Sequence, residues 1–139
     1  MFQTVVVGAD GSPTAAEAVK TAVELVKLVG GTLHIVTAYK PQQYSSGGQE
    51  YAKSLDSGGV AESLLADLAS QARIAGVGVE VHPESGDPAQ AIINVAKRVE
   101  ADLVVVGNKG MAGVRRVLGS VPNTVAHEAP CSVLIAQTT

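Results

Sequence analysis

The chain of 139 residues is long enough for one domain with its own core, and 46% of its residues are hydrophobic. Only three Tyr and one Phe are present, so Val, Ala, Leu and Ile must fill the interior. The formal net charge of −3 gives no reason to expect nucleic acid or an acidic membrane as a partner. No apolar run approaches the ~18–20 residues of a membrane helix, and the single cysteine excludes an internal disulfide. We therefore expect a cytoplasmic protein.

The first third of the chain shows a strand pattern, a helix pattern and a second strand pattern. The β-branched run TVVVGA at 4–9 predicts a strand, and TLHIVTAY at 32–39 predicts the next. Between them, Ser12 is expected to cap a helix that begins at Pro13, where a missing N–H costs no hydrogen bond. The predicted buried face of this helix consists of Ala15, Ala18, Ala22, Leu25 and Val29, and Gly30–Gly31 ends it.

The middle of the chain begins with a polar, turn-rich segment at 40–59. It is predicted to be a long loop that is mobile or is ordered by a ligand or partner. A helix follows, and its apolar positions recur at helical spacing before Gly76: Leu64, Leu65, Leu68, Ala72 and Ala75. The run VGVEVH at 77–82 predicts a third strand near a sheet edge, because Gly78 weakens it.

The last third repeats the alternation. Asp87 and Pro88 give a second cap-and-proline start, and the buried stripe predicted after them is Ala91, Ile92, Val95 and Val99. DLVVVG at 102–107 predicts a fourth strand. A short helix ends before Pro130, and CSVLIA at 131–136 predicts the fifth strand.

Five strands separated by helices predict a single α/β domain over 1–139, with a five-stranded parallel sheet and helices on both faces. Right-handed crossovers and one reversal favour a doubly wound sheet with strand order 3-2-1-4-5. In that order the first and fourth strands are neighbours, and ligands bind at the carboxyl ends of such a pair. The sequence therefore nominates GADGSP at 8–13 and the segment after the fourth strand as the site.

The segment at 107–121, GNKGMAGVRRVLGSV, combines glycines with cations, and no acid lies between Asp102 and Glu128. Its glycines are Gly107, Gly110, Gly113 and Gly119, and its cations are Lys109, Arg115 and Arg116. Glycine lets backbone N–H groups approach a ligand, and a helix N-terminus adds oriented donors. The spacing fits neither a P-loop nor the dinucleotide fingerprint. Two interpretations remain: a phosphate cradle, or a turn that needs glycine and carries solvated cations.

These patterns resemble the universal stress protein family, through VVVGADGSP near the start and ADLVVVGNKGMAGVRRVLGSVPNTVAHEAPCSVLIA near the end. The family's ATP-binding members carry Gly, two residues, Gly, nine residues, then Gly with Ser or Thr. This chain matches Gly107, Gly110, Gly119 and Ser120, with eight residues between Gly110 and Gly119. The resemblance implies a Rossmann-like fold of the adenine nucleotide alpha hydrolase type. It also implies ATP, alone or with Mg²⁺, as the ligand, and a homodimer formed through strand 131–136.

The resemblance also implies roles for single residues. Backbone near Gly8, Ala9, Thr37 and Ala38 would edge the adenine, and Asp10 would accept hydrogen bonds from the ribose. Gly107 and Gly110 would line the phosphates, and Gly119, Ser120 and Val121 would receive the terminal phosphates at the last helix. Asn108 and Arg116 complete the candidate set, with the role of Arg116 resting on its charge alone. Asp10 has an alternative role as a cap of the first helix.

Two other groups of residues, a possible hydrolase triad and a possible histidine metal site, are less well supported by the sequence. Ser120 and His127 lie two turns apart on one short helix without a Gly-x-Ser-x-Gly elbow, so no hydrolase triad is expected. His34, His82 and His127 lie in separate elements without ligand spacing, so no metal site is expected.

The sequence thus predicts an ATP-binding regulator of the stress response that works with an unnamed protein partner. No catalytic residue is evident, so ATP would mark a state or be hydrolysed slowly. One alternative is a cyclic-AMP binder or sink, because the same crevice fits adenosine with one phosphate. A second alternative is a nucleotide-free interaction module whose partner surface is the segment 40–59.

Overall fold

The computed structural model describes residues 1–10, 12–39, 62–108 and 118–138. The expected loop at 40–59 and most of the glycine-rich segment lie outside these ranges. The elements are β1 (Thr4–Gly8), α1 (Pro13–Val29), β2 (Thr32–Tyr39), β3 (Gly78–Ser85), α3 (Pro88–Arg98), β4 (Leu103–Gly107), α4 (Ser120–Glu128) and β5 (Ser132–Ala136). A further helix covers 62–74 between β2 and β3. No helix in the described part of the chain is long and apolar enough to cross a membrane.

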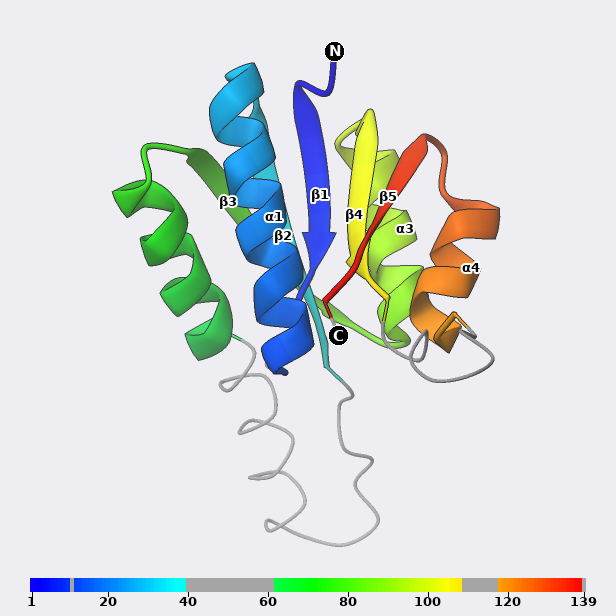
Figure 1. The fold of residues 1–139 in the computed structure, drawn as a ribbon. Coiled ribbons are helices and arrows are strands. Elements are labelled where there is room, and N and C mark those ends of the chain that lie inside the picture. The colour runs from blue at the N-terminus through cyan, green and yellow to red at the C-terminus, as the bar shows by residue number, and fades with distance from the viewer. Residues whose placement is uncertain (11, 40–61, 109–117, 139) are drawn as a thin grey trace, which may run out of the picture.

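The strands form one five-stranded sheet in the order β3-β2-β1-β4-β5, which confirms the predicted topology. Every neighbouring pair is parallel. β1 is the central strand, and its Val7 pairs with Ile35 of β2 on one side and Val105 of β4 on the other. Figure 1 shows that α1 and the helix at 62–74 cover one face of the sheet, while α3 and α4 cover the other.

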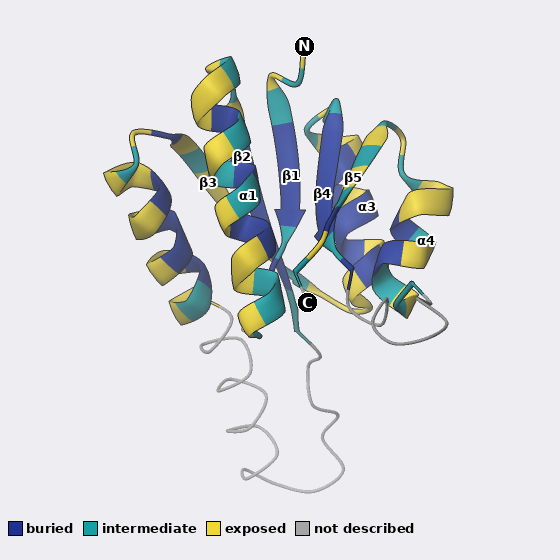
Figure 2. Ribbon diagram, in the orientation of Figure 1, coloured by how far each residue is buried: buried dark blue, intermediate teal, exposed yellow. Residues whose placement is uncertain are grey.

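The central strands are buried on both faces, as Figure 2 shows by their dark blue colour. Val5 and Val7 pack into the core under α1, Val6 packs into the core under α3, and all three have no exposed surface. Burying a valine side chain fully contributes roughly 1.5–3 kcal/mol. The edge strand β3 has only exposed and half-buried residues, and β5 buries only Ala136, so the core centres on β2, β1 and β4.

The helices begin where the sequence predicted. Ser12 caps α1, its Oγ accepting the N–H of Ala15 at 3.1 Å, and Asp87 caps α3 in the same way. Gly30 ends α1 in the left-handed region with φ of 77°, which glycine adopts at little cost.

The predicted buried face of α1 was only partly right. Ala18 and Ala22 are buried, but Val19 and Val26 complete the stripe. Leu25 is half-buried, because the contact with the sheet is rotated by about one position.

A hydrogen-bonded clamp joins β1 and β4 at their amino ends. The carboxylate of Asp102 accepts the N–H of Gln3 at 2.9 Å and the N–H of Thr4 at 3.0 Å. The Asp102 N–H in turn donates to the Thr4 carbonyl at 3.0 Å. The clamp therefore fixes the register of two strands that lie far apart in sequence, and the carboxyl ends of the same pair open into a pocket.

Candidate functional site

A pocket of about 410 Å³ lies at the carboxyl ends of β1 and β4, within the range of roughly 300–1,000 Å³ that small-molecule sites occupy. Its wall on the β1 side contains Gly8, Ala9, Asp10 and Ala38. Its wall on the β4 side contains Gly107, Gly119, Ser120 and Val121. The structure therefore brings together eight of the residues nominated from the sequence. Gly110 and Arg116 lie outside the described residues.

Thr37 and Asn108 were nominated as binding residues, but neither lines the pocket. Both are buried. The Thr37 hydroxyl donates to the Ala9 carbonyl, and the Ala9 N–H donates to the Val36 carbonyl at 2.8 Å. The Asn108 Oδ1 accepts from the N–H of Thr138 at 2.8 Å. These two residues therefore hold the strand ends that carry the pocket, because their side-chain polar groups point into the protein.

An apolar floor, which the sequence reading missed, covers the other half of the pocket. It is formed by Val36, Ile92, Val106 and the prolines Pro88 and Pro122. Ile92 approaches β1 so closely that a Cβ on Gly8 would lie 2.5 Å from its Cδ1. Glycine at position 8 therefore permits this close approach. The sequence assigned Ile92 to the buried stripe of its helix. Ile92 lies one turn after Pro88, and this position near the start of the helix could have indicated a pocket residue.

The polar end of the pocket is the N-terminus of α4. Its N-cap, Gly119, has no side chain with which to cap the helix, whereas Ser12 and Asp87 cap α1 and α3. The N–H groups of Ser120 and Val121 have no partner within the helix and carry its partial positive charge. Gly119 has φ of −62° and ψ of 164°, which any residue can adopt, so its backbone does not require glycine. The pocket therefore offers an uncapped helix N-terminus suited to an anion.

Asp10 lies at the pocket rim and is exposed. Its Oδ1 accepts the N–H of Ser12 at 2.9 Å, while the helix cap itself is the Ser12 hydroxyl. Asp10 therefore does not cap α1. Its carboxylate instead accepts a hydrogen bond from Ser12, the residue that does cap the helix. Asp10 is the only ionisable side chain among the described residues that line the pocket.

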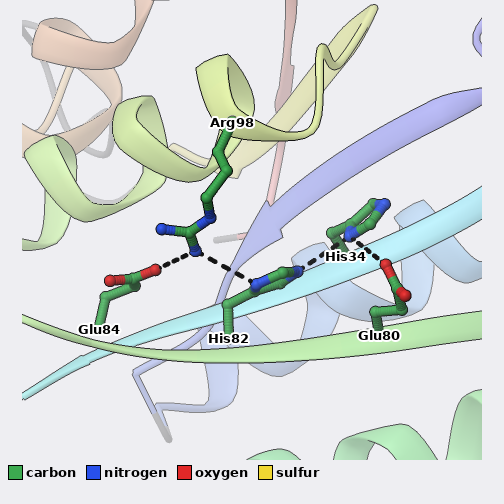
Figure 3. Close-up of polar contacts among 5 residues, drawn as sticks. All are labelled: His34, Glu80, His82, Glu84 and Arg98. Carbon is green, nitrogen blue, oxygen red and sulfur yellow. Dashed lines mark hydrogen bonds and ion pairs between the residues drawn. The ribbon is translucent and has the colours of Figure 1, made fainter.

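A second polar cluster lies on β2 and β3, away from the pocket (Figure 3). His34 and His82 lie in separate strands, as the sequence predicted, but strand pairing brings His34 Nδ1 to 2.9 Å from His82 Nε2. The parallel register places Glu80 opposite His34, and its Oε2 lies 3.3 Å from the same nitrogen. His127 is exposed on α4 and is not part of this cluster.

Burial is the main cause that lowers the pKa of both His34 and His82 below the ordinary value of 6.5. For His82, the neighbouring His34 and Arg98 lower the pKa further, against Glu80 and Glu84. Both rings are therefore neutral near pH 7. The signal that could have revealed the pair is strand register, because residues 34 and 82 fall on the same face of adjacent strands.

Comparison with known proteins supports the fold and gives the family. The chain matches the Universal stress protein family over residues 1–137. It is 38% identical over 144 residues to universal stress protein Rv1636 of Mycobacterium tuberculosis, covering 99% of this chain and 98% of the relative.

Solved structures of universal stress proteins share the fold of this chain. A universal stress protein in complex with cAMP has a TM-score of 0.81 at 38% identity, covering 99% and 98% of the two chains. UspA from Lactobacillus plantarum shares the fold, with a TM-score of 0.82 at 21% identity and 98% coverage of both chains. The chain therefore belongs to the universal stress protein family.

Proposed function

We propose that this protein binds an adenine nucleotide in the pocket between β1 and β4 and acts as a nucleotide-dependent regulator in the stress response. The observation that carries the proposal is the uncapped N-terminus of α4 beside an apolar floor. Family membership and the 38% identical relative solved with cAMP support it.

The proposed pose follows from the two halves of the pocket. The base would lie on the floor of Val36, Ile92 and Val106, where its flat apolar faces lose contact with water. The ribose would face Asp10, whose carboxylate accepts hydrogen bonds from hydroxyl groups. A phosphate would receive the N–H groups of Ser120 and Val121 and benefit from the helix dipole. With Asp10 as the only ionisable side chain on the described lining, the proposed role is binding rather than rapid turnover.

ATP and cyclic AMP are the two candidate ligands. The glycine pattern favours ATP, alone or with Mg²⁺, because the family resemblance assigns it to members that bind ATP. The relative solved with cAMP favours cyclic AMP, whose single phosphate would end at the helix.

Calorimetric titration with ATP, cyclic AMP and adenosine, followed by competition, decides between the two ligands. Mass spectrometry of small molecules released from purified protein identifies what the protein carries. If none of the three compounds binds at millimolar concentration, the nucleotide proposal is wrong. The result would then favour the alternative of a nucleotide-free interaction module.

We further propose a cytoplasmic homodimer formed through β5. An exposed apolar edge strand tends to pair with a strand of another chain. β5 lies at the sheet edge, and its Leu134 is 39% exposed. Val133 packs against the core under α3, so replacing it would also disturb the fold. Leu134→Lys is therefore the cleaner test and should shift the mass measured by light scattering from dimer to monomer. An unchanged mass would exclude this interface.

A further inference from the structure

The cluster on β2 and β3 places three ligand atoms around one point. His34 Nδ1, His82 Nε2 and a Glu80 carboxylate oxygen all lie within 4.8 Å of one another. Two of the separations are 2.9 Å, between the ring nitrogens, and 3.3 Å, between His34 Nδ1 and Glu80 Oε2. Figure 3 shows the three side chains converging, with Arg98 and Glu84 on the far side of His82.

Hydrogen bonding alone does not satisfy this cluster. Arg98 only donates, so the His82 Nδ1 atom that it faces at 3.4 Å must lack a proton, which places the proton on Nε2. That proton is donated to His34 Nδ1, and the Glu80 carboxylate then faces a second acceptor at 3.3 Å. The opposite pair of tautomers satisfies Glu80 and turns an N–H toward Arg98. Two neutral imidazoles therefore always leave one contact mismatched, either an acceptor facing an acceptor at Glu80 or a donor facing a donor at Arg98.

We propose that His34, Glu80 and His82 form a site for a divalent transition metal of the zinc type, with water as the fourth ligand. Two imidazoles and one carboxylate with an open position are a donor set that Zn²⁺ takes. Tetrahedral zinc with bonds of about 2.0–2.1 Å needs its ligand atoms roughly 3.3 Å apart, close to the two separations seen here. Mg²⁺ and Ca²⁺ are disfavoured, because they prefer oxygen ligands.

Burial divides the ligands into a fixed and a mobile part. The His34 side chain is only 6% exposed and is held in the sheet, whereas the Glu80 side chain is 66% exposed and can move onto an ion. The exposed side leaves room for water. Metal ligands must be deprotonated, and the lowered pKa values of both rings keep them neutral at pH 7.

Arg98 is the competitor in this arrangement. Metal on Nε2 of His82 would place a proton on Nδ1, so Arg98 would have to give up its contact at 3.4 Å. It can do so, because its side chain is 54% exposed and is also paired with Glu84. Glu84 would then be the acceptor available to the His82 Nδ1–H, in the manner of carboxylates that orient metal-bound histidines.

The site is separate from the nucleotide pocket, because none of its three ligands lines that pocket. The test is calorimetric titration of nucleotide-free, tag-free protein with Zn²⁺ at pH 7.5, supported by the visible spectrum of bound Co²⁺. One ion per chain is expected. His82→Ala should weaken binding by more than about 100-fold, since loss of an outer-shell partner alone costs 10–100-fold. Glu80→Gln, which keeps the size of an exposed side chain, should weaken it by at least about 10-fold.

Two further variants separate this site from general affinity for histidine. His127→Ala removes the histidine outside the cluster and should leave Zn²⁺ binding unchanged. Arg98→Ala removes a cation and frees Glu84, so Zn²⁺ binding should tighten. Failure of the wild type to bind Zn²⁺, or equal binding by His82→Ala, overturns the proposal. Weaker binding by Arg98→Ala overturns the assignment of Arg98 as the competitor.

Discussion

The pocket between β1 and β4 and the histidine cluster on β2 and β3 are built from different parts of the same sheet. The pocket uses backbone groups, small residues and a helix N-terminus at the ends of fully buried strands. The cluster uses long polar side chains that project from the middle of two strands, one of them an edge. A binding site in this fold can therefore arise from where strands end or from how strands align.

The two regions also differ in what holds them in place. Apart from Asp10, the pocket is shaped mainly by main chain whose hydrogen bonds are already made within the protein, as at Ala9, so changes of backbone or bulk should alter it most. The cluster is held by a few side chains, and Glu80 and Arg98 are exposed enough to move. Mutations that remove polar atoms should therefore affect the cluster and, in the pocket, Asp10, whereas mutations that add atoms should affect the pocket.

Gly119→Val is the sharpest test of that difference and carries the largest expected effect. A branched side chain at the α4 entrance should weaken nucleotide binding by about 100-fold or more, as expected for two lost hydrogen bonds to a charged group at roughly 1.5–3 kcal/mol each. Circular dichroism should remain close to wild type, because φ and ψ at this position suit valine. Calorimetry measures the affinity.

The control for Gly119→Val is Ala126→Val, which also ends in a valine side chain but at an exposed position of α4 outside the pocket. Zn²⁺ binding should be the same in both variants. A folded Gly119→Val protein that binds nucleotide as tightly as wild type contradicts the placement of phosphate at α4.

Asp10→Ala tests the one charged side chain on the described lining of the pocket. If the carboxylate accepts from the ribose, affinity should fall by about 10- to 150-fold, the equivalent of roughly 1.5–3 kcal/mol. Asp87→Ala is the control, because it removes a carboxylate that caps α3 and does not line the pocket. It should lower the melting temperature and leave affinity unchanged. The same result for Asp10→Ala would assign Asp10 to the turn alone.

Gly8→Ala probes the close approach of β1 and Ile92 through stability instead of binding. The added Cβ would lie 2.5 Å from Ile92 Cδ1, and overpacking of this kind costs roughly 1–3 kcal/mol. Ile92→Val removes that methyl group, so the double variant should regain part of the loss. Urea unfolding of the two single variants and the double variant measures the coupling. Additive losses would show that the two residues do not compete for space.

The smallest expected effect is a pH dependence in metal-free protein. The pKa values of His34 and His82 are lower in the folded than in the unfolded chain, so the unfolded chain binds more protons as pH falls below 6.5. Stability from these rings is fully present above pH 6.5 and is lost as pH falls from 6.5 toward the folded pKa values. Burial is the main cause of the lowered pKa values, while Arg98 beside His82 adds to the lowering and Glu80 and Glu84 oppose it.

The measurement is the melting temperature in the presence of a chelator at pH 7.5 and pH 5.5. His82→Gln should reduce the drop, whereas His127→Ala should not. A melting temperature that is flat over this range in wild type would mean that the pair is not buried in its neutral form.

Much of the fold follows from local patterns in the sequence. Serine or aspartate before proline marked the starts of α1 and α3, because capping is decided within a few residues. The strand order followed from five strand patterns separated by helices, and it placed the pocket at β1 and β4. Seven of the eight nominated pocket residues lie in the two segments that this order singles out, 8–13 and 107–121, whereas Ala38 was assigned only through the family resemblance.

The remaining features depend on contacts between distant segments. His34 and His82 meet only because β2 and β3 pair in one register, and periodicity within one strand does not contain that information. Ile92 was read as a core residue because burial in the core and exposure to a pocket give the same helical spacing. Thr37 and Asn108 were nominated as ligand contacts, and the structure shows their side chains bonded to Ala9 and Thr138, which the sequence pattern could not reveal.

The pairing of β1 with β4 has a consequence for how the molecule assembles and how long it lasts. Thr4 and Asp102 are 98 positions apart, so the central strand is made first and receives its second neighbour only after most of the chain exists. Such remote contacts slow folding. A ligand held between Asp10 and Ser120 would bridge both sides of this seam and add about 2.7 kcal/mol at a concentration 100 times its Kd. Resistance to proteolysis would then rise with ligand concentration, and the survival time of the protein would itself report the level of nucleotide.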